Sequence, residues 1–330
     1  MYSQAEVSIS NLLICPYCNS QDSINHKLIY QNQSLECPNC KKKYSSIENV
    51  PILTNEHSQL KNEDPSKRQN FYNTHYYHRS RTKDIQSAYL LAERRIVANF
   101  VKEHNINGLC LEIGCGTGIF ADMAPNYLGM DYSFSAVFAE GFSNYNRIVA
   151  SAESIPLQDQ SAQLVISFNT LEHIPDPKLA FQEIDRVLMP NGYAILKPAW
   201  HCTKYNTELL PIKEYNQLNL EQKLRKFLLP LFKSKIFKFL TRIPARLLRR
   251  ITYHLFYSQS STKLQYRKLI PYLGDDVFIA DCDATADIDF HEGLLYFESR
   301  DYKILSHKTL SHRLLAGNDI LIVQKTKNKR

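Results

Sequence analysis

The chain has 330 residues, of which 44% are hydrophobic and 22% are charged, and its formal net charge is +7. This composition is typical of a globular protein, and no run of about eighteen apolar residues is present that could span a membrane. The first residues, Met1 to Glu6, lack the basic stretch of a signal peptide, so we expect a bacterial cytoplasmic protein whose cysteines stay reduced.

Four cysteines near the N-terminus stand in two closely spaced pairs. Cys15 and Cys18 form the first C-x2-C pair, and Cys37 and Cys40 form the second after eighteen residues. This spacing predicts a Zn²⁺ site with four thiolate ligands, and redox or disulfide cysteines are the alternative. Because four thiolates leave no open position for a substrate, the metal should be structural.

An apolar stretch from Tyr44 to Leu53 follows the second cysteine pair. Together with the cysteines, it resembles the end of the small zinc-ribbon family that activates tRNA, ribosomal RNA and protein methyltransferases. The resemblance implies a zinc ribbon over residues 1–55, which is too small to bury a core and would be folded by its metal. The sequence leaves open whether this ribbon only supports a larger domain or also contacts substrate.

An apolar strand that begins at Cys110 runs directly into three glycines at alternate positions, Gly114, Gly116 and Gly118. Glycine lets the backbone come close to a ligand that lies across a strand end, and it also allows positive φ values. A second apolar run ends about twenty residues later in Asp131, where a carboxylate can accept hydrogen bonds from both hydroxyls of a ribose. Asp131 is therefore a predicted ribose ligand, with an N-cap as the alternative.

Strands and helices continue to alternate after Asp131. Gln163–Asn169 has the pattern of a buried strand, residues 178–188 that of an amphipathic helix, and residues 193–197 that of a further strand. This order, with the glycine turn, resembles the type 11 branch of the class I S-adenosylmethionine (SAM) dependent methyltransferases. The resemblance implies an α/β, Rossmann-like, doubly wound and mostly parallel seven-stranded sheet, with residues 84–200 as the methyltransferase core and SAM as the methyl donor.

The resemblance also implies a set of SAM-binding residues: Glu112, Gly114, Cys115, Gly116, Gly118, Asp131, Tyr132, Ser151, Ala152 and Asn169. Ser151 stands where the family usually has an aspartate that binds the adenine amino group, and Ala152 would offer its backbone amide to the ring. Serine can accept the same hydrogen bond without a charge, so we expect weaker binding at this point.

Three residues after the fourth strand are candidate catalytic residues, because this strand end opens onto the cofactor crevice: Asn169, Glu172 and His173. A neutral His173 is the predicted general base for a hydroxyl acceptor, and a packing or capping role is the alternative. A quinone-pathway subgroup holds a divalent ion here with two acids and a histidine. Because Asn169 replaces the first acid, we expect no metal at this place.

A tyrosine-rich stretch from Phe71 to His78 lies in residues 56–83, which otherwise have the composition of a polar linker. In the family, a similar stretch folds over the methionine end of the cofactor. Tyr76 and Tyr77 are therefore candidates for a lid, and a surface loop packed by its aromatic side chains is the alternative.

Thirteen Lys and Arg residues and no acid lie between Glu221 and Asp275, so the basic charge belongs to one segment. Within it, a basic face and an apolar face alternate with helical spacing: Lys235, Lys238, Arg242, Arg246 and Arg249 against Ile236, Phe239, Leu240, Ile243, Leu247 and Ile251. Pro244 predicts a kink or break. The segment, residues 223–268, is interpreted as an interfacial helix on anionic lipid, as a cover helix with its apolar face on the domain, or as a nucleic-acid binder.

Residues 201–275 are thus predicted to form an insertion after the fifth strand, and residues 276–330 to complete the sheet with a helix and an antiparallel hairpin. Insertions here usually shape the acceptor pocket in such enzymes. We expect O-methylation of a small or lipid-linked, saccharide-type acceptor, in the cytoplasm and peripherally at the inner face of the membrane. An RNA (tRNA or rRNA) methyltransferase and a non-catalytic adaptor with the same fold are the alternatives, and the sequence does not set the methylated atom or the oligomeric state.

Overall fold

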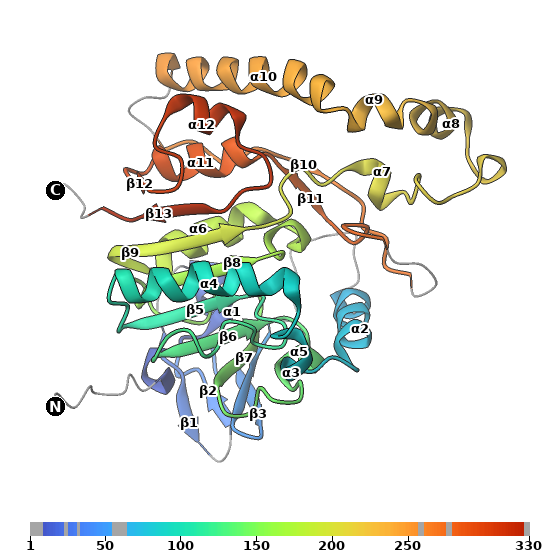
Figure 1. The fold of residues 1–330 in the computed structure, drawn as a ribbon. Helices are drawn as coiled ribbons and strands as arrows, with labels where there is room; N and C mark the ends of the chain where they lie inside the picture. The colour runs from blue at the N-terminus through green and yellow to red at the C-terminus, as the bar shows by residue number, and fades with distance from the viewer. Residues whose placement is uncertain are drawn as a thin grey trace.

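The computed structural model describes residues 9–22, 26–31, 34–54, 65–256, 261–274 and 279–326. Each of the N-terminal, linker, insertion and C-terminal segments predicted from the sequence lies partly outside these residues. Within them, the chain forms a mixed α/β structure with parallel central strands and helices on both faces of the sheet (Figure 1).

The centre of the sheet consists of five parallel strands. In spatial order they are β7 (Asn146–Ala150), β6 (Tyr127–Asp131), β5 (Leu109–Ile113), β8 (Ala162–Phe168) and β9 (Leu188–Lys197). β13 (Leu321–Gln324) and β12 (Lys303–Ile304) continue it antiparallel beyond β9. The chain builds the sheet outward in one direction from β5 and in the other from β8, and open α/β sheets bind ligands at such a switch point.

The central strands are buried on both faces by helices, which are α4 (Ala88–Glu103), α6 (Pro177–Val187) and α11 (Phe290–Glu298). Because successive strand residues point to opposite faces, Leu111 and Val165 pack in the cluster that contains α6 and α11. Leu164 and Ile166 pack in a second cluster with α4. The unbroken apolar runs of the sequence follow from this burial on two sides.

The N-terminal region continues the same sheet. It contains η1 (Ile9–Leu12), α1 (Pro16–Asp22), β1 (Ile29–Gln31), β2 (Ser34–Glu36), β3 (Lys43–Ile47) and β4 (Val50–Leu53). β4 pairs in parallel with β7 through Ile52 with Val149 and Leu53 with Ala150. Among the described residues the sheet therefore has eleven strands, of which the methyltransferase-like part supplies seven.

Helix α2 (Pro65–Tyr76) occupies the segment for which the sequence predicts a linker or a surface loop, so the loop alternative is wrong for these residues. α3 (Arg81–Asp84) follows it, and α5 (Phe134–Val137) lies beside it. The side chain of Asn73 accepts hydrogen bonds from the Ser133 hydroxyl at 3.1 Å and from the Ser135 amide at 3.3 Å. These bonds fix α2 over the end of β6.

The insertion contains α7 (Lys204–Thr207), η3 (Tyr215–Gln217), α8 (Leu220–Phe227), α9 (Leu229–Lys233) and α10 (Lys235–Phe256). The last three form a row along one edge of the molecule (Figure 1). After it, β10 (Tyr266–Lys268) pairs antiparallel with β11 (Ala286–Ile288), and α12 (Leu310–Leu315) lies under α10. No helix in the described part of the chain is both long and apolar enough to cross a membrane.

The structure differs from two expectations for α10. The helix does not break at Pro244: proline cannot donate a hydrogen bond to the Leu240 carbonyl, but both residues face solvent, where water can satisfy that carbonyl. The cover-helix alternative also fails, since the apolar side chains do not face the domain: Ile236 and Leu240 are 72% and 63% exposed, whereas Arg246 is 5% exposed.

Candidate active site

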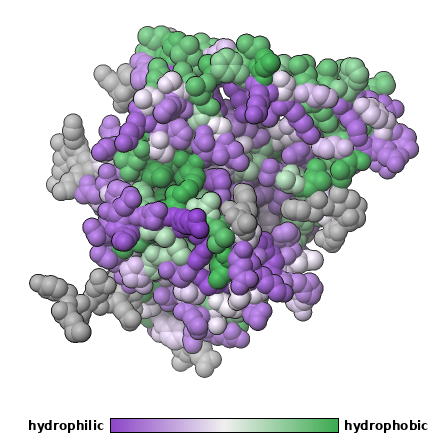
Figure 2. Space-filling model, in the orientation of Figure 1, coloured by the Kyte–Doolittle hydropathy of each residue, from purple (hydrophilic) through white to green (hydrophobic). Residues whose placement is uncertain are grey.

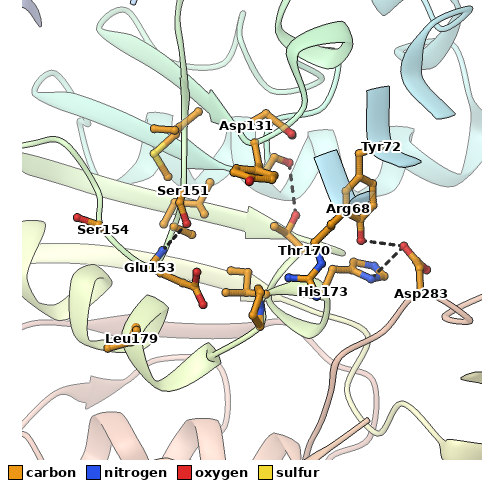
Figure 3. A pocket seen from close by; sticks show the side chains of 18 of the residues that line it. Arg68, Tyr72, Asp131, Ser151, Glu153, Ser154, Thr170, His173, Leu179 and Asp283 are labelled. Atoms are coloured by element: carbon orange, nitrogen blue, oxygen red, sulfur yellow. Dashed lines mark hydrogen bonds and ion pairs between the residues drawn. The ribbon is translucent and has the colours of Figure 1, made fainter. Parts of the chain in front are cut away.

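A cavity of about 360 Å³ lies at the C-terminal ends of the parallel strands. Each of four strands contributes the residue that follows or ends it: Gly114 after β5, Asp131 at the end of β6, Ser151 after β7 and Asn169 after β8. Figure 3 shows the side chains that face this space. These four positions, which the sequence analysis assigns to the cofactor site, thus line one cavity.

The glycine turn needs its glycines for two physical reasons. Gly114 and Gly118 have φ values of +67° and +76°, which other residues rarely adopt. A Cβ atom at Gly114 would also lie 2.2 Å from Thr170, and one at Gly118 would lie 2.2 Å from the Phe142 ring. Larger residues would push the turn away from the strand end.

Asp131 is held by the glycine turn and by the start of α5. One carboxylate oxygen accepts a hydrogen bond from the Gly116 amide and the other from the Ser133 amide, both at 2.8 Å. Burial raises the pKa of Asp131, although these backbone donors oppose the shift. Each oxygen keeps a second lone pair, so the carboxylate can accept hydrogen bonds from two vicinal hydroxyls.

The opposite wall of the cavity is built from the loop after β7 and from the N-terminal region. The Ser151 hydroxyl accepts a hydrogen bond from the Glu153 amide at 3.2 Å, and both residues line the cavity with Ala152. Pro16 and Tyr17 of α1 lie on the same side, where the Pro16 carbonyl accepts a hydrogen bond from Ser154 at 2.8 Å. The cysteine-rich region thus contributes directly to this wall.

His173 lies on the side of the cavity that faces the C-terminal segment (Figure 3). Its Nδ1 atom is 3.2 Å from Asp283, and its Nε2 atom is 3.5 Å from Glu172. Tyr72 donates a hydrogen bond to the same Asp283 carboxylate at 3.0 Å. Burial disfavours a charged imidazole here, but the carboxylates of Asp283 and Glu172 outweigh it and raise the pKa of His173 above its ordinary value of 6.5.

Some of the predicted site residues lie behind the cavity wall. Glu112 is 2% exposed and accepts a hydrogen bond from Tyr127, and burial raises its pKa to about 8. Glu172 is 1% exposed, and burial raises its pKa too. Neither carboxylate lines the cavity, and the same holds for Cys115, Gly116 and Gly118. These residues can support the cavity wall, but they do not line the cavity in which a ligand would lie.

Tyr132 and Tyr76 line the cavity, whereas Tyr77 is 73% exposed and does not. Because Tyr77 follows the last residue of α2, its side chain leaves the face of the helix that covers the cavity. The predicted lid role therefore has structural support at Tyr76 and none at Tyr77.

Several polar lining residues were missed by the sequence reasoning, among them Arg68, Tyr72, Glu153, Asp281 and Asp283. Glu153 could have been found, because it lies two residues after Ser151 and supplies a carboxylate where the family pattern lacks one. Asp283 could not, because it comes from the segment before β11, more than a hundred residues after His173. Only the fold brings the two together.

The four N-terminal cysteines converge on one point, with all four sulfur atoms within 4.8 Å of one another. The Cys15 and Cys40 sulfurs are 3.6 Å apart, and the Cys18 and Cys37 sulfurs are 3.8 Å apart. Thiolates about 2.3 Å from a tetrahedral Zn²⁺ ion lie about 3.8 Å apart, whereas a disulfide needs about 2.05 Å. The donor set and its spacing therefore fit zinc.

A family model for a methyltransferase domain, the type 11 model, matches residues 111–196. An uncharacterized protein of Methanocaldococcus jannaschii is 31% identical over 145 residues, which cover 39% of this chain and 56% of that protein. A probable S-adenosylmethionine-dependent methyltransferase of Mycobacterium tuberculosis is 36% identical over 121 residues, which cover 34% of this chain and 44% of that protein. The chain thus spans about half the length of these curated relatives.

Among solved structures, an S-adenosylmethionine-dependent methyltransferase from Mesorhizobium loti is similar, with 18% identity. The match covers 35% of this chain and 55% of that chain, with a TM-score of 0.30.

Proposed function

We propose that this chain, which contains a class I SAM-dependent methyltransferase domain, transfers a methyl group from SAM to a hydroxyl of a small or lipid-linked, saccharide-type acceptor. The observation that carries the proposal is the cavity itself. It combines a glycine turn and Asp131 on one side with a histidine–carboxylate pair, His173 and Asp283, on the other.

The residues present fit SAM as a ligand. Asp131 would bind the ribose hydroxyls with its two free lone pairs, and Gly114 lets the backbone approach the ligand. Ser151 and the Ala152 amide would bind the adenine ring, and the nearby Glu153 carboxylate offers the negative charge that Ser151 lacks. When bound, SAM supplies a methyl group that is already activated by its sulfonium charge.

The protein's own task would then be to orient the acceptor and to remove its proton. His173 would accept the hydroxyl proton as a general base. Asp283 would hold the imidazole in one orientation and stabilise its charged form, and Tyr72 would hold Asp283. Asn169, which lines the cavity at a φ of +48°, would position substrate rather than exchange protons.

We further propose that Cys15, Cys18, Cys37 and Cys40 bind one structural Zn²⁺ ion. The ion would hold α1 against the cavity through Pro16 and Tyr17, so the ribbon would support the cofactor site as well as fold locally.

The charge distribution disfavours RNA as the acceptor. Five of the thirteen cationic residues between Glu221 and Asp275 pair with carboxylates of the protein itself: Arg225, Arg246, Arg249, Arg250 and Arg267. Cations that are already neutralised cannot release counterions from a phosphate backbone, so the basic segment offers less to nucleic acid than its composition suggests.

Titration calorimetry with SAM tests the proposal. An enzyme should bind SAM at one site per chain, whereas a non-catalytic adaptor need not bind it. Purified protein is then incubated with tritiated SAM and with separate lipid, small-molecule and RNA fractions. We expect label in the lipid or small-molecule fraction that disappears with His173→Asn. Label in RNA alone, or no SAM binding at all, would replace this proposal with one of the alternatives.

A further inference from the structure

The helices of the insertion turn their apolar side chains outward. Eleven large apolar residues between 220 and 255 are 42–85% exposed, and this set is called the apolar ridge below. It begins on α8 with Leu220 and Phe227, passes Leu231 on α9 and continues on α10 through Leu240 and Leu248. Figure 2 shows a hydrophobic band along the edge where Figure 1 places these helices.

The outward orientation of α10 is fixed by ion pairs on its inner face. Arg246 pairs with Asp289 at 2.9 Å, and Arg249 and Arg250 pair with Glu292 and Glu298, each at 2.8 Å. Arg246 also donates hydrogen bonds to the carbonyls of residues 314 and 316. Turning the ridge inward would break these contacts, and separating a buried ion pair is strongly unfavourable. The ridge is therefore a specified feature of the fold.

The charges beside the ridge favour one kind of partner. Lys233 and Lys235 are exposed next to it, and residues 222–256 contain no acid. A second copy of the chain would bring the same cations to the same apolar surface, and α8, α9 and α10 together carry a single carboxylate, Glu221 in the first turn of α8, to set against them. An anionic lipid surface offers apolar chains to the ridge and negative headgroups to the lysines.

We propose that the apolar ridge docks on an anionic lipid bilayer, with α8, α9 and α10 lying in the headgroup boundary. This surface is separate from the methyl-transfer cavity, so the inference does not rest on the proposed function. The helices would bind as amphipathic helices do, with the apolar face in the lipid. Their basic face would contact the rest of the protein, whereas in an isolated amphipathic helix it contacts water.

The test is flotation of the full-length protein with vesicles of phosphatidylcholine alone or mixed with phosphatidylglycerol. We expect binding to the anionic vesicles that weakens as salt is raised. The double variant Phe239→Gln/Leu240→Gln should lower the partition coefficient at least tenfold, because both side chains are exposed on the ridge. Lys233→Gln/Lys235→Gln should reduce binding several-fold and only on anionic vesicles.

The matched control is Leu310→Gln/Leu315→Gln, which removes two similarly exposed leucines from α12 and should leave vesicle binding unchanged. Unchanged thermal unfolding of each variant confirms that the fold is intact. The proposal is overturned if the wild-type protein does not float with anionic vesicles at low salt, or if the Phe239/Leu240 variant binds them equally well. Ridge-dependent dimers without vesicle binding, or ridge-dependent binding of RNA, would equally overturn it.

Discussion

At the scale of single residues, the cavity depends on carboxylates whose neighbours decide what each can do. Asp131 keeps free lone pairs because its donors are two backbone amides, whereas Glu112 is occupied by Tyr127 and buried behind the turn. Asp283 is committed to His173 and Tyr72. Three acids in or beside one cavity thus differ in what they can bind, because their burial and partners differ although their chemistry is alike.

Replacing Asp131 with Ala should weaken SAM binding by about 1–3 kcal/mol, because the charged hydrogen bonds to ribose are lost. Titration calorimetry measures this change directly. Asp319→Asn, at an exposed surface position, should leave the affinity as it is. Equal SAM affinity in the Asp131→Ala variant would remove this carboxylate from the proposed site.

Replacing Asp283 with Asn should lower the pKa of His173. The carboxylate of Asp283 is the largest influence that raises this pKa, and burial alone would lower it. Because its pKa lies above 6.5, wild-type His173 should lose its proton and become a neutral base only at a pH above that value. The Asp283→Asn variant should lose the proton at a lower pH than the wild type. Side-chain NMR titration, with His173→Asn to assign the signal, measures both values.

The control for this titration is Asp281→Asn, two residues away. Asp281 also raises the pKa of His173, but less than Asp283 does, so the shift should be smaller. If the two variants shift the signal equally, Asp283 has no special relation to the imidazole.

At the scale of elements, sequence periodicity identified an apolar face and a basic face on α10 but did not decide which of the two packs against the rest of the protein. Hydrophobic spacing alone favours an inward apolar face. The outcome is decided by acids elsewhere in the chain, Asp289, Glu292 and Glu298, which lie on or beside α11 and meet the arginines. By contrast, β6 (Tyr127–Asp131) ends at Asp131, where the sequence places the end of the second apolar run, because a buried strand is specified by its own apolar residues.

Replacing Arg246 with Gln should destabilise the protein by about 3 kcal/mol, because Asp289 would lose its partner and two carbonyls would lose a donor. Lys235→Gln, on the exposed part of the same helix, should change the stability by less than about 0.5 kcal/mol. Urea unfolding followed by circular dichroism compares the two variants. A similarly small effect of both would mean that ion pairing does not hold α10 in place.

At the scale of the whole molecule, the N-terminal region and the methyltransferase-like core share one sheet and one cavity wall. β4 pairs with β7, and Asn19 of α1 donates a hydrogen bond to Glu183 of α6 at 3.2 Å. The cysteine spacing predicted that the four thiols lie together, as they do, but spacing carries no information on where a small module attaches. The attachment depends on pairing between strands almost a hundred residues apart.

Replacing Cys37 with Ser should remove the bound zinc and destabilise both regions together. We expect a single unfolding transition whose midpoint is lower by about 5 °C or more, and weaker SAM binding because α1 forms part of the cavity wall. Elemental analysis, calorimetric unfolding and SAM titration measure the three effects. The control is Cys282→Ser, which replaces a buried cysteine outside the ribbon, and this variant should bind as much zinc as the wild type. If the unfolding transition of the core is unchanged in Cys37→Ser, the two regions are not coupled.

The position of Asp283 has a consequence for how such proteins diverge. The segment that matches the methyltransferase family model ends at residue 196, while Asp283, the carboxylate 3.2 Å from His173, lies well beyond it. The part of the cavity within residues 111–196 can therefore stay the same during evolution while the residues around Asp283 change. Two homologues with the same donor half can differ in acceptor and in working pH through changes confined to the residues before β11.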